Sequence, residues 1–221
     1  MLSIFKTSDG SDTIYDEVNN YYYHSVHGAI TESKHVFINY GLHTMASRLD
    51  NVRIFEMGFG TGLNAFLTYL YAVNHGSLNI SYTAIEKWPL PDFLYESLNY
   101  PEILQTPDAN EQFLSFHQCS WNQAKRFTEN FILEKINGDL TIWDTQESFD
   151  LIYMDAFSPN DQAELWEEEV LLKFYRMLSH GGLLTTYCAK GDFKRSLKRI
   201  GFKVENVPGP MGKREMTLAY K

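Results

Sequence analysis

The chain has 221 residues, of which 44% are hydrophobic and 15% aromatic, so it is long and apolar enough for one α/β domain with a small terminal extension. Its net charge of −9 argues against a protein coated in basic surface, and no apolar run approaches the roughly 18 residues of a membrane span. The first ten residues lack the pattern of a secretory signal, and Cys119 and Cys188 have no metal-ligand spacing. These features indicate a cytoplasmic protein with reduced thiols and no membrane association.

The first forty residues do not have the pattern of a Rossmann-type unit. Two short β-like pieces, Ile4–Lys6 and Thr13–Tyr15, flank a turn signal at Asp9–Asp12. An aromatic and polar cluster follows at 21–29. We therefore expect residues 1–40 to form an N-terminal extension over one end of a sheet, and residues 41–221 to form the main domain, opening with a helix over Gly41–Leu49.

A strand, a glycine turn and a helix follow one another near residue 60. Short apolar residues lead to Glu56, and then Gly58, Gly60 and Gly62 alternate with other residues before a helix-forming run from Leu63. Glycines permit positive φ and let a ligand approach the backbone. A dinucleotide fingerprint needs Gly-x-Gly-x-x-Gly, which Leu63 breaks. Acidic-x-Gly-x-Gly-x-Gly instead resembles motif I of the S-adenosylmethionine (SAM)-dependent methyltransferases.

The rest of the chain alternates predicted strands and helices. Residues 88–130 read as helical and irregular, Asp161–Leu178 as one helix ended by His180-Gly181-Gly182, and the stretch around Phe193–Ile200 as another. The predicted strands are Ile80–Glu86, Phe131–Ile136, Phe149–Met154, Leu183–Ala189, Phe202–Asn206 and Met216–Tyr220. The alternation predicts an α/β, Rossmann-like fold: a mostly parallel twisted sheet with helices on both faces and a β-rich N-terminal extension.

Four predicted strands end in an acidic residue. Because the carboxyl ends of parallel strands share one edge of a sheet, we expect these four carboxylates to meet in one crevice. In a SAM site, Glu56 would hold water or the ligand's ammonium group and Glu86 would accept hydrogen bonds from the ribose. Asp139, after Gly138, would accept from the adenine amino group, and Asp155 would lie where the methyl group is transferred. Any one of them alone would more often be a helix cap or a turn residue.

Several longer motifs resemble one family of SAM-dependent enzymes. The motifs are Glu56–Asn64, Glu86–Leu90, Asp150–Pro159, Glu164–Trp166, Tyr187–Gly191 and Pro208–Met216, together with Tyr23–Ala29 and Glu32–Phe37 near the N-terminus. Together they resemble the MnmC-type tRNA methyltransferases, over about residues 9 to 219. Ser158 stands where alanine is commoner in that family.

The resemblance implies an activity and a set of site residues. It implies methylation of 5-aminomethyl-2-thiouridine to 5-methylaminomethyl-2-thiouridine at the wobble position, 34, in the anticodon loop of tRNA. The expected cofactor-binding residues are Glu56, Gly58, Gly60, Gly62, Asn64, Glu86, Lys87, Gly138, Asp139 and Asp155. The expected substrate-binding residues are Tyr23, His24, Phe157, Lys190, Lys213 and Arg214, with Asp155 as the catalytic residue.

The chain also departs from the two-domain members of that family. Those members carry a C-terminal flavin-dependent oxidase domain, whereas this chain ends soon after Lys213-Arg214-Glu215-Met216. It therefore resembles the stand-alone methyltransferase form. We expect SAM as the cofactor, no FAD, no metal and no obligate protein partner, with another protein supplying the preceding oxidative step.

The proposed chemistry needs an amine without its proton. An alkylamine resembles lysine, with a pKa of about 10, and a protonated amine has no lone pair. Asp155 is the candidate that accepts the proton, while Phe157 and the N-terminal aromatic residues would lower the amine pKa by excluding water. The aromatic rings of Phe157, Tyr23 and Trp166 are candidates for stacking the base, Trp166 being the weakest, and His24 and His27 for orienting it.

A basic tail could bind RNA. Residues 190–221 contain nine Lys or Arg and three acidic residues, although the charge alone favours a solvated helix face over a ligand-binding one. Two other functions stay open: a SAM-dependent N-methyltransferase of a small-molecule amine, and a non-catalytic methyltransferase-fold module that binds RNA. A nicotinamide oxidoreductase is disfavoured by the glycine spacing.

Overall fold

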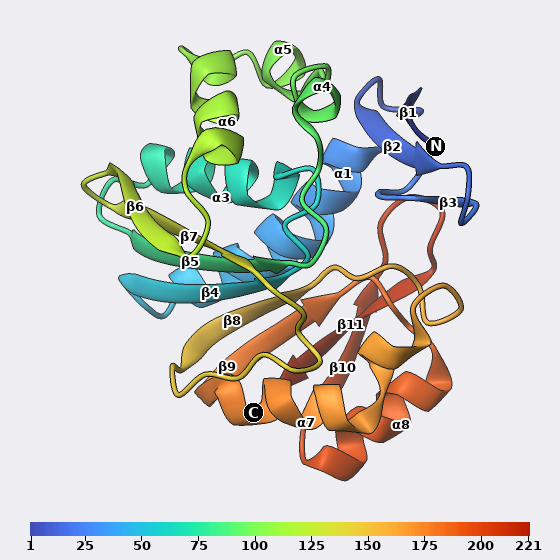
Figure 1. Ribbon diagram of the computed structural model, residues 1–221. Coiled ribbons are helices and arrows are strands. Elements are labelled where there is room, and N and C mark those ends of the chain that lie inside the picture. The colour runs from blue at the N-terminus through green and yellow to red at the C-terminus, as the bar shows by residue number, and fades with distance from the viewer.

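The computed structural model describes residues 1–221 and has an eight-stranded sheet at its centre, with helices on both faces (Figure 1). Its strand order is β10-β11-β9-β8-β4-β5-β7-β6. The strands are β4 (Asn51–Met57), β5 (Asn79–Glu86), β6 (Gln123–Thr128), β7 (Phe131–Asn137), β8 (Phe149–Met154), β9 (Leu178–Thr186), β10 (Lys203–Pro208) and β11 (Glu215–Tyr220). The predicted α/β fold class is confirmed.

The middle of the sheet is parallel and its two ends are antiparallel. Strand β4 pairs in parallel with β5 and β8, β5 with β7, and β8 with β9. The edge strands β6 and β10, and β11 beside β9, run antiparallel to their neighbours. All six residues of β8 are buried, as expected for a parallel strand covered on both faces. The carboxyl ends of β4, β5, β7 and β8 therefore lie on one edge.

Two layers of helices complete the core. Residues of α3 (Leu63–Asn74) and α6 (Ala109–Gln118) belong to the larger core cluster on one face of the sheet. The short helices α4 (Asp92–Tyr95) and α5 (Tyr100–Leu104) add to the same cluster. Residues of α7 (Glu168–Met177) and α8 (Gly191–Ile200) belong to a second cluster on the other face. None of the helices has both the length and the apolar character needed to cross a bilayer.

The N-terminal region contains a small sheet and a long helical segment. Strands β1 (Leu2–Lys6), β2 (Asp12–Asp16) and β3 (Tyr21–Tyr22) form a three-stranded antiparallel sheet. The segment that follows is helical without a break: α1 (Ala29–Ser33), the π-helix η1 (Lys34–Leu42) and α2 (His43–Ala46). The prediction that this helix spans Gly41–Leu49 was wrong, because Val36, Phe37 and Ile38 are buried in succession and hide the helical period. Residue 40, where we expected the N-terminal extension to end, lies inside η1.

Two other predicted elements differ from the structure, and one strand was not predicted. The helix predicted over Asp161–Leu178 is broken at Glu167, which has extended backbone between the 3₁₀ turn η2 (Ala163–Trp166) and α7. Strand β9 begins at Leu178 rather than Leu183, because Gly181 and Gly182 lie within the strand at an irregularity in its pairing with β8. The edge strand β6, which is largely exposed, lacks an apolar pattern and was not predicted.

Candidate active site

A cavity of about 620 Å³ lies at the carboxyl ends of β4, β5, β7 and β8. The four acidic residues predicted to converge, Glu56, Glu86, Asp139 and Asp155, all line it. The expected binding residues Gly58, Gly60, Asn64, Lys87 and Gly138 line it as well. The sheet topology therefore gathers most of the predicted cofactor residues around one space.

The glycine turn has two functions. Gly58 and Gly60 have φ of 88° and 48° and line the cavity, so backbone rather than side chain meets a ligand there. Gly62, with φ of 73°, does not line the cavity but precedes α3. A Cβ at Gly62 would lie 2.8 Å from Nε2 of His117, so this glycine is required for packing against α6.

Two of the acidic side chains share one amide donor. Nδ2 of Asn64 donates to Oε1 of Glu56 over 3.0 Å and to Oδ2 of Asp155 over 2.7 Å. Glu56 is 1% exposed, and its Oε2 is buried without a hydrogen-bond partner. Burial, with the nearby charge of Asp155, raises the pKa of Glu56 well above its usual value. The surroundings of Glu56 therefore favour its protonated form, and a cation beside it would favour the carboxylate.

Asp155 is able to exchange a proton near neutral pH. Burial, and then the negative charge of Glu32, raise the pKa of Asp155 to about 7, against the hydrogen bond from Asn64 and the positive charge of Lys213. A base with a pKa near the working pH is the kind that general acid–base catalysis favours. Asp155 is therefore the best-suited proton acceptor in the cavity.

The acidic residues of β5 and of the turn after β7 have a different environment. Oε2 of Glu86 accepts from the backbone N–H of Gly60 over 3.0 Å, and Oε1 accepts from that of Trp88 over 2.8 Å. Oδ2 of Asp139 lies 2.8 Å from Nζ of Lys87. Hydrogen bonds from Lys87 and Thr141 lower the pKa of Asp139 to about 2, so this carboxylate stays charged.

Aromatic rings from the N-terminal sheet cover Phe157. The ring of Tyr21 lies 3.9 Å from that of Phe157, centroid to centroid, and the ring of Tyr23 lies 5.0 Å away at 90°. All three line the cavity, as does Trp88, which is 72% exposed. Tyr21 and Trp88 were not predicted as site residues, because aromatic residues beside a turn have no periodic pattern.

His24, His27 and Trp166 were also predicted near the substrate. His24 lines the cavity, and its Nε2 lies 2.7 Å from Oγ1 of Thr61. Burial lowers the pKa of His24 to about 4, so it is neutral at pH 7. Neither His27 nor Trp166 lines the cavity. Trp166 is 8% exposed and its Nε1 donates to the carbonyl of Phe157, so it supports the site from behind rather than stacking a base.

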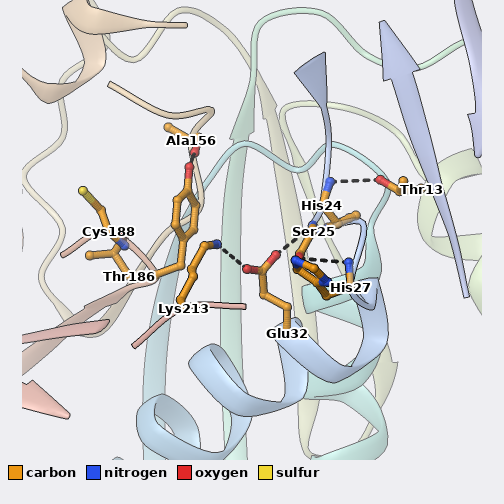
Figure 2. A network of polar contacts seen from close by, with 10 residues as sticks. Thr13, His24, Ser25, His27, Glu32, Ala156, Thr186, Cys188 and Lys213 are labelled. Atoms are coloured by element: carbon orange, nitrogen blue, oxygen red, sulfur yellow. Dashed lines mark hydrogen bonds and ion pairs between the residues drawn. The ribbon is translucent and has the colours of Figure 1, made fainter. Parts of the chain in front are cut away.

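The three basic residues predicted to bind substrate lie outside the cavity lining. Nζ of Lys190 donates to Oδ1 of Asn160, Arg214 is exposed, and Nζ of Lys213 lies 2.5 Å from Oε1 of Glu32 (Figure 2). Other basic residues of the tail are paired with acids: Lys194 with Glu215, Arg195 with Asp192, Arg199 with Glu168, and Lys203 with Glu205.

Sequence reasoning missed the wall formed by η2 and α7. Gln162, Glu164, Glu167, Glu169 and Lys173 line the cavity from this side. Nζ of Lys173 donates to the carbonyl of Leu140 over 2.7 Å and so holds the turn that follows Asp139. Acidic residues are favourable in the first turns of a helix, so their presence in the helix predicted over Asp161–Leu178 gave no reason to place them at a cavity.

Comparisons with known proteins give the family. The family model described as S-adenosyl-L-methionine-dependent methyltransferase matches residues 106–221. The tRNA 5-methylaminomethyl-2-thiouridine biosynthesis bifunctional protein MnmC of Leptospira borgpetersenii is 30% identical in a match that covers 88% of this chain. The same-named protein of Campylobacter jejuni is 30% identical over 92% of this chain. The chain spans only 31% and 34% of the length of these two relatives.

Solved structures agree with this relationship. MnmC2 from Aquifex aeolicus superposes with a TM-score of 0.79 at 27% identity, over 99% of this chain and 69% of that one. A putative class I S-adenosylmethionine-dependent methyltransferase from Listeria monocytogenes shares the fold, with a TM-score of 0.52 at 14% identity, over 87% of this chain and 61% of that one. The family match covers more than half of the chain, and the fold and the acid-lined cavity agree with it. The chain belongs to the S-adenosyl-L-methionine-dependent methyltransferases.

Proposed function

We propose that this protein transfers a methyl group from SAM to the primary amine of 5-aminomethyl-2-thiouridine at the wobble position of tRNA. The product would be 5-methylaminomethyl-2-thiouridine, the nucleoside in the name of the bifunctional relatives. The observation that carries the proposal is Asp155, a carboxyl with a pKa of about 7 in a cavity beside Phe157. Such a group suits removal of a proton from an amine in a site that also takes an aromatic base.

The residues of the cavity fit SAM. The partnerless, buried Oε2 of Glu56 suits the ammonium group of the ligand, and Glu86, held by the backbone of Gly60 and Trp88, suits the ribose hydroxyls. Asp139 and Gly138 line the same cavity, and we assign them to the adenine amino group. Bound SAM supplies a methyl group on a positively charged sulfur, and the electron pair of the broken carbon–sulfur bond stays on that sulfur.

Asp155 and the aromatic residues around Phe157 would have different effects on the amine. Asp155 takes the proton that the amine must lose before its nitrogen lone pair can form the new nitrogen–carbon bond. A carboxylate alone would favour the ammonium form of the amine. Tyr21, Tyr23 and Phe157 oppose that preference because they exclude water and so lower the amine pKa.

The same aromatic rings suit an RNA base that is no longer stacked on its neighbours. Bases of single-stranded RNA loops are commonly held by stacking on aromatic side chains, and a wobble base in the anticodon loop is accessible in this way. Phe157 and Tyr23 remain our stacking candidates, and the exposed ring of Trp88 joins them. Lys190 and Arg214, which have no acidic partner, would meet phosphates, so tRNA affinity should fall steeply as salt is raised.

The proposal is tested by methyl transfer from labelled SAM to two acceptors in parallel. We expect incorporation into tRNA that carries 5-aminomethyl-2-thiouridine and none into a free primary alkylamine. Turnover of the free amine without RNA would instead support a small-molecule N-methyltransferase. Binding of tRNA with no affinity for SAM would support the non-catalytic module and overturn the proposal.

A further inference from the structure

The loop that joins β10 and β11 reaches the N-terminal region of the chain (Figure 1). Nε2 of His35 lies 2.8 Å from the carbonyl oxygen of Pro208, where this loop begins. A Cβ at Gly212, which has φ of 85°, would come within 2.4 Å of Cδ2 of His27, so the two segments are in tight contact. The loop is therefore fixed against residues 27–35, although about 180 residues separate them.

An ion pair lies at this contact. Nζ of Lys213 is 2.5 Å from Oε1 of Glu32, and their side chains are 34% and 9% exposed (Figure 2). The other carboxylate oxygen of Glu32 accepts the backbone N–H of Ser25 over 2.9 Å. A pair that is this shielded from water acts more strongly on its surroundings than a surface pair does.

The pair is connected to the residue after Asp155. Nζ of Lys213 lies 3.9 Å from the centre of the Tyr187 ring, and the hydroxyl of Tyr187 donates to the carbonyl of Ala156 over 2.7 Å. Figure 2 shows Lys213 and Glu32 pointing toward one another below the carbonyl of Ala156. None of Glu32, Lys213 and Tyr187 lines the cavity.

We propose that Glu32, Lys213 and Tyr187 form a clasp that fixes the turn after Asp155 and sets the electrostatic field at its carboxyl group. They are positioning residues for the reaction, and Lys213 acts through Asp155 rather than on the substrate. The mechanistic consequence rests on the proposed function, whereas the effect on Asp155 itself does not.

The two charges of the clasp act on Asp155 in opposite directions. The negative charge of Glu32 favours the protonated form of Asp155, and the positive charge of Lys213 favours the carboxylate. The other titratable groups that act on Asp155, or on which its charge acts, are Glu56 on β4 and the phenols of Tyr82, Tyr100 and Tyr187. Of these groups, Tyr187 is also acted on by Glu32 and Lys213, and burial holds its pKa far above neutral, so its phenol stays protonated in the titration.

The test is a titration of the Asp155 carboxyl by carbon-13 NMR in the full chain, with the signal assigned by its loss in Asp155→Asn. Lys213→Met should raise the midpoint by about one pH unit, and Glu32→Gln should lower it by a similar amount. The double variant should return close to wild type, and Lys213→Arg should not move the midpoint. Lys203→Met, which breaks the exposed pair with Glu205, is the matched control and should have no effect.

A merely structural role would give a different result. It would lower the melting temperature of Lys213→Met and Glu32→Gln while leaving the midpoint of the Asp155 titration in place, or it would move that midpoint in the same direction in both variants. Either result overturns the proposal. Tyr187→Phe keeps the ring beside Lys213 but loses the bond to Ala156, so kcat should fall about tenfold with SAM affinity retained. Unchanged kcat in Tyr187→Phe would remove that residue from the clasp. The titration needs no substrate, so it stands even if the tRNA assay of the wild type fails.

Discussion

Four carboxyl groups line the same cavity, and burial raises the pKa of Glu56, Glu86 and Asp155, whereas the pKa of Asp139 is lowered to about 2. Glu56 and Asp155, on β4 and directly after β8, share one amide donor and have raised pKa values because they are buried. Asp139 is paired with Lys87 and keeps its charge, and both oxygens of Glu86 are held by backbone N–H groups. Residues of one chemical type at equivalent strand ends can therefore serve proton transfer at one side of a cavity and ligand binding at the other.

The largest effect should come from removing the proton acceptor. Asp155→Asn keeps the acceptor oxygen for Asn64 but cannot take a proton, so kcat should fall about 10²- to 10⁴-fold while SAM affinity stays near wild type. Steady-state kinetics and calorimetry measure the two quantities. Asp150→Asn is the control, because Asp150 lies at the start of β8 and pairs with Arg53 away from the cavity. Full activity in Asp155→Asn would remove Asp155 from the chemistry.

Replacement of Glu86, on the ligand-binding side of the cavity, should lower SAM affinity rather than kcat. Glu86→Gln replaces one acceptor oxygen with an amide NH2 that cannot accept a hydrogen bond, so SAM affinity should fall about 10- to 100-fold, with kcat largely retained at saturating SAM. Calorimetric titration with SAM gives the affinity. A loss of kcat with unchanged SAM affinity would show that Glu86 acts in the methyl transfer rather than in SAM binding.

The third prediction concerns pH. A folded-state pKa of about 7 for Asp155 lies above the ordinary 3.8, so the folded protein holds this proton more tightly than the unfolded chain. The carboxyl therefore lowers stability as pH rises from about 4 to about 7. Asp155→Asn should raise the melting temperature at pH 8 by several degrees and much less at pH 4. Equal melting temperatures at pH 8 would contradict the raised pKa.

The smallest effect is expected for the exposed ion pair. Lys87→Met leaves Asp139 with its bonds from Thr141, and an ion pair this exposed contributes about 0–1 kcal/mol. SAM affinity should therefore change only a few-fold. A complete loss of SAM binding would show that Lys87 contacts the ligand directly.

Much of the fold followed from local patterns. Buried strands such as β8 are mostly apolar, and Gly58 and Gly60 mark the turn after β4. The convergence of Glu56, Glu86, Asp139 and Asp155 then followed from the parallel topology. The helical segment from Ala29 did not follow, since its buried residues lack helical spacing. Strand β6 lies at an exposed edge, where hydrophobic patterning is weakest.

The parts of the site that were missed depend on contacts between distant segments. Nothing near Glu32 in the sequence indicates that its partner is Lys213, and the basic tail gave Lys213 an RNA-binding role instead. Trp166 was a stacking candidate because its indole is aromatic, whereas its burial and its bond to Phe157 emerge only from packing. Tyr21 faces Phe157 only because the N-terminal sheet folds over the cavity.

The most direct test of the proposed function is the mass of the modified nucleoside. Transfer RNA carrying 5-aminomethyl-2-thiouridine would be incubated with SAM and the protein, digested, and analysed by mass spectrometry. We predict the addition of one methyl group to that nucleoside alone, at a rate about 10²- to 10⁴-fold lower with Asp155→Asn. An unmodified nucleoside in the presence of protein that binds SAM would contradict the proposed substrate and leave only the family and the fold.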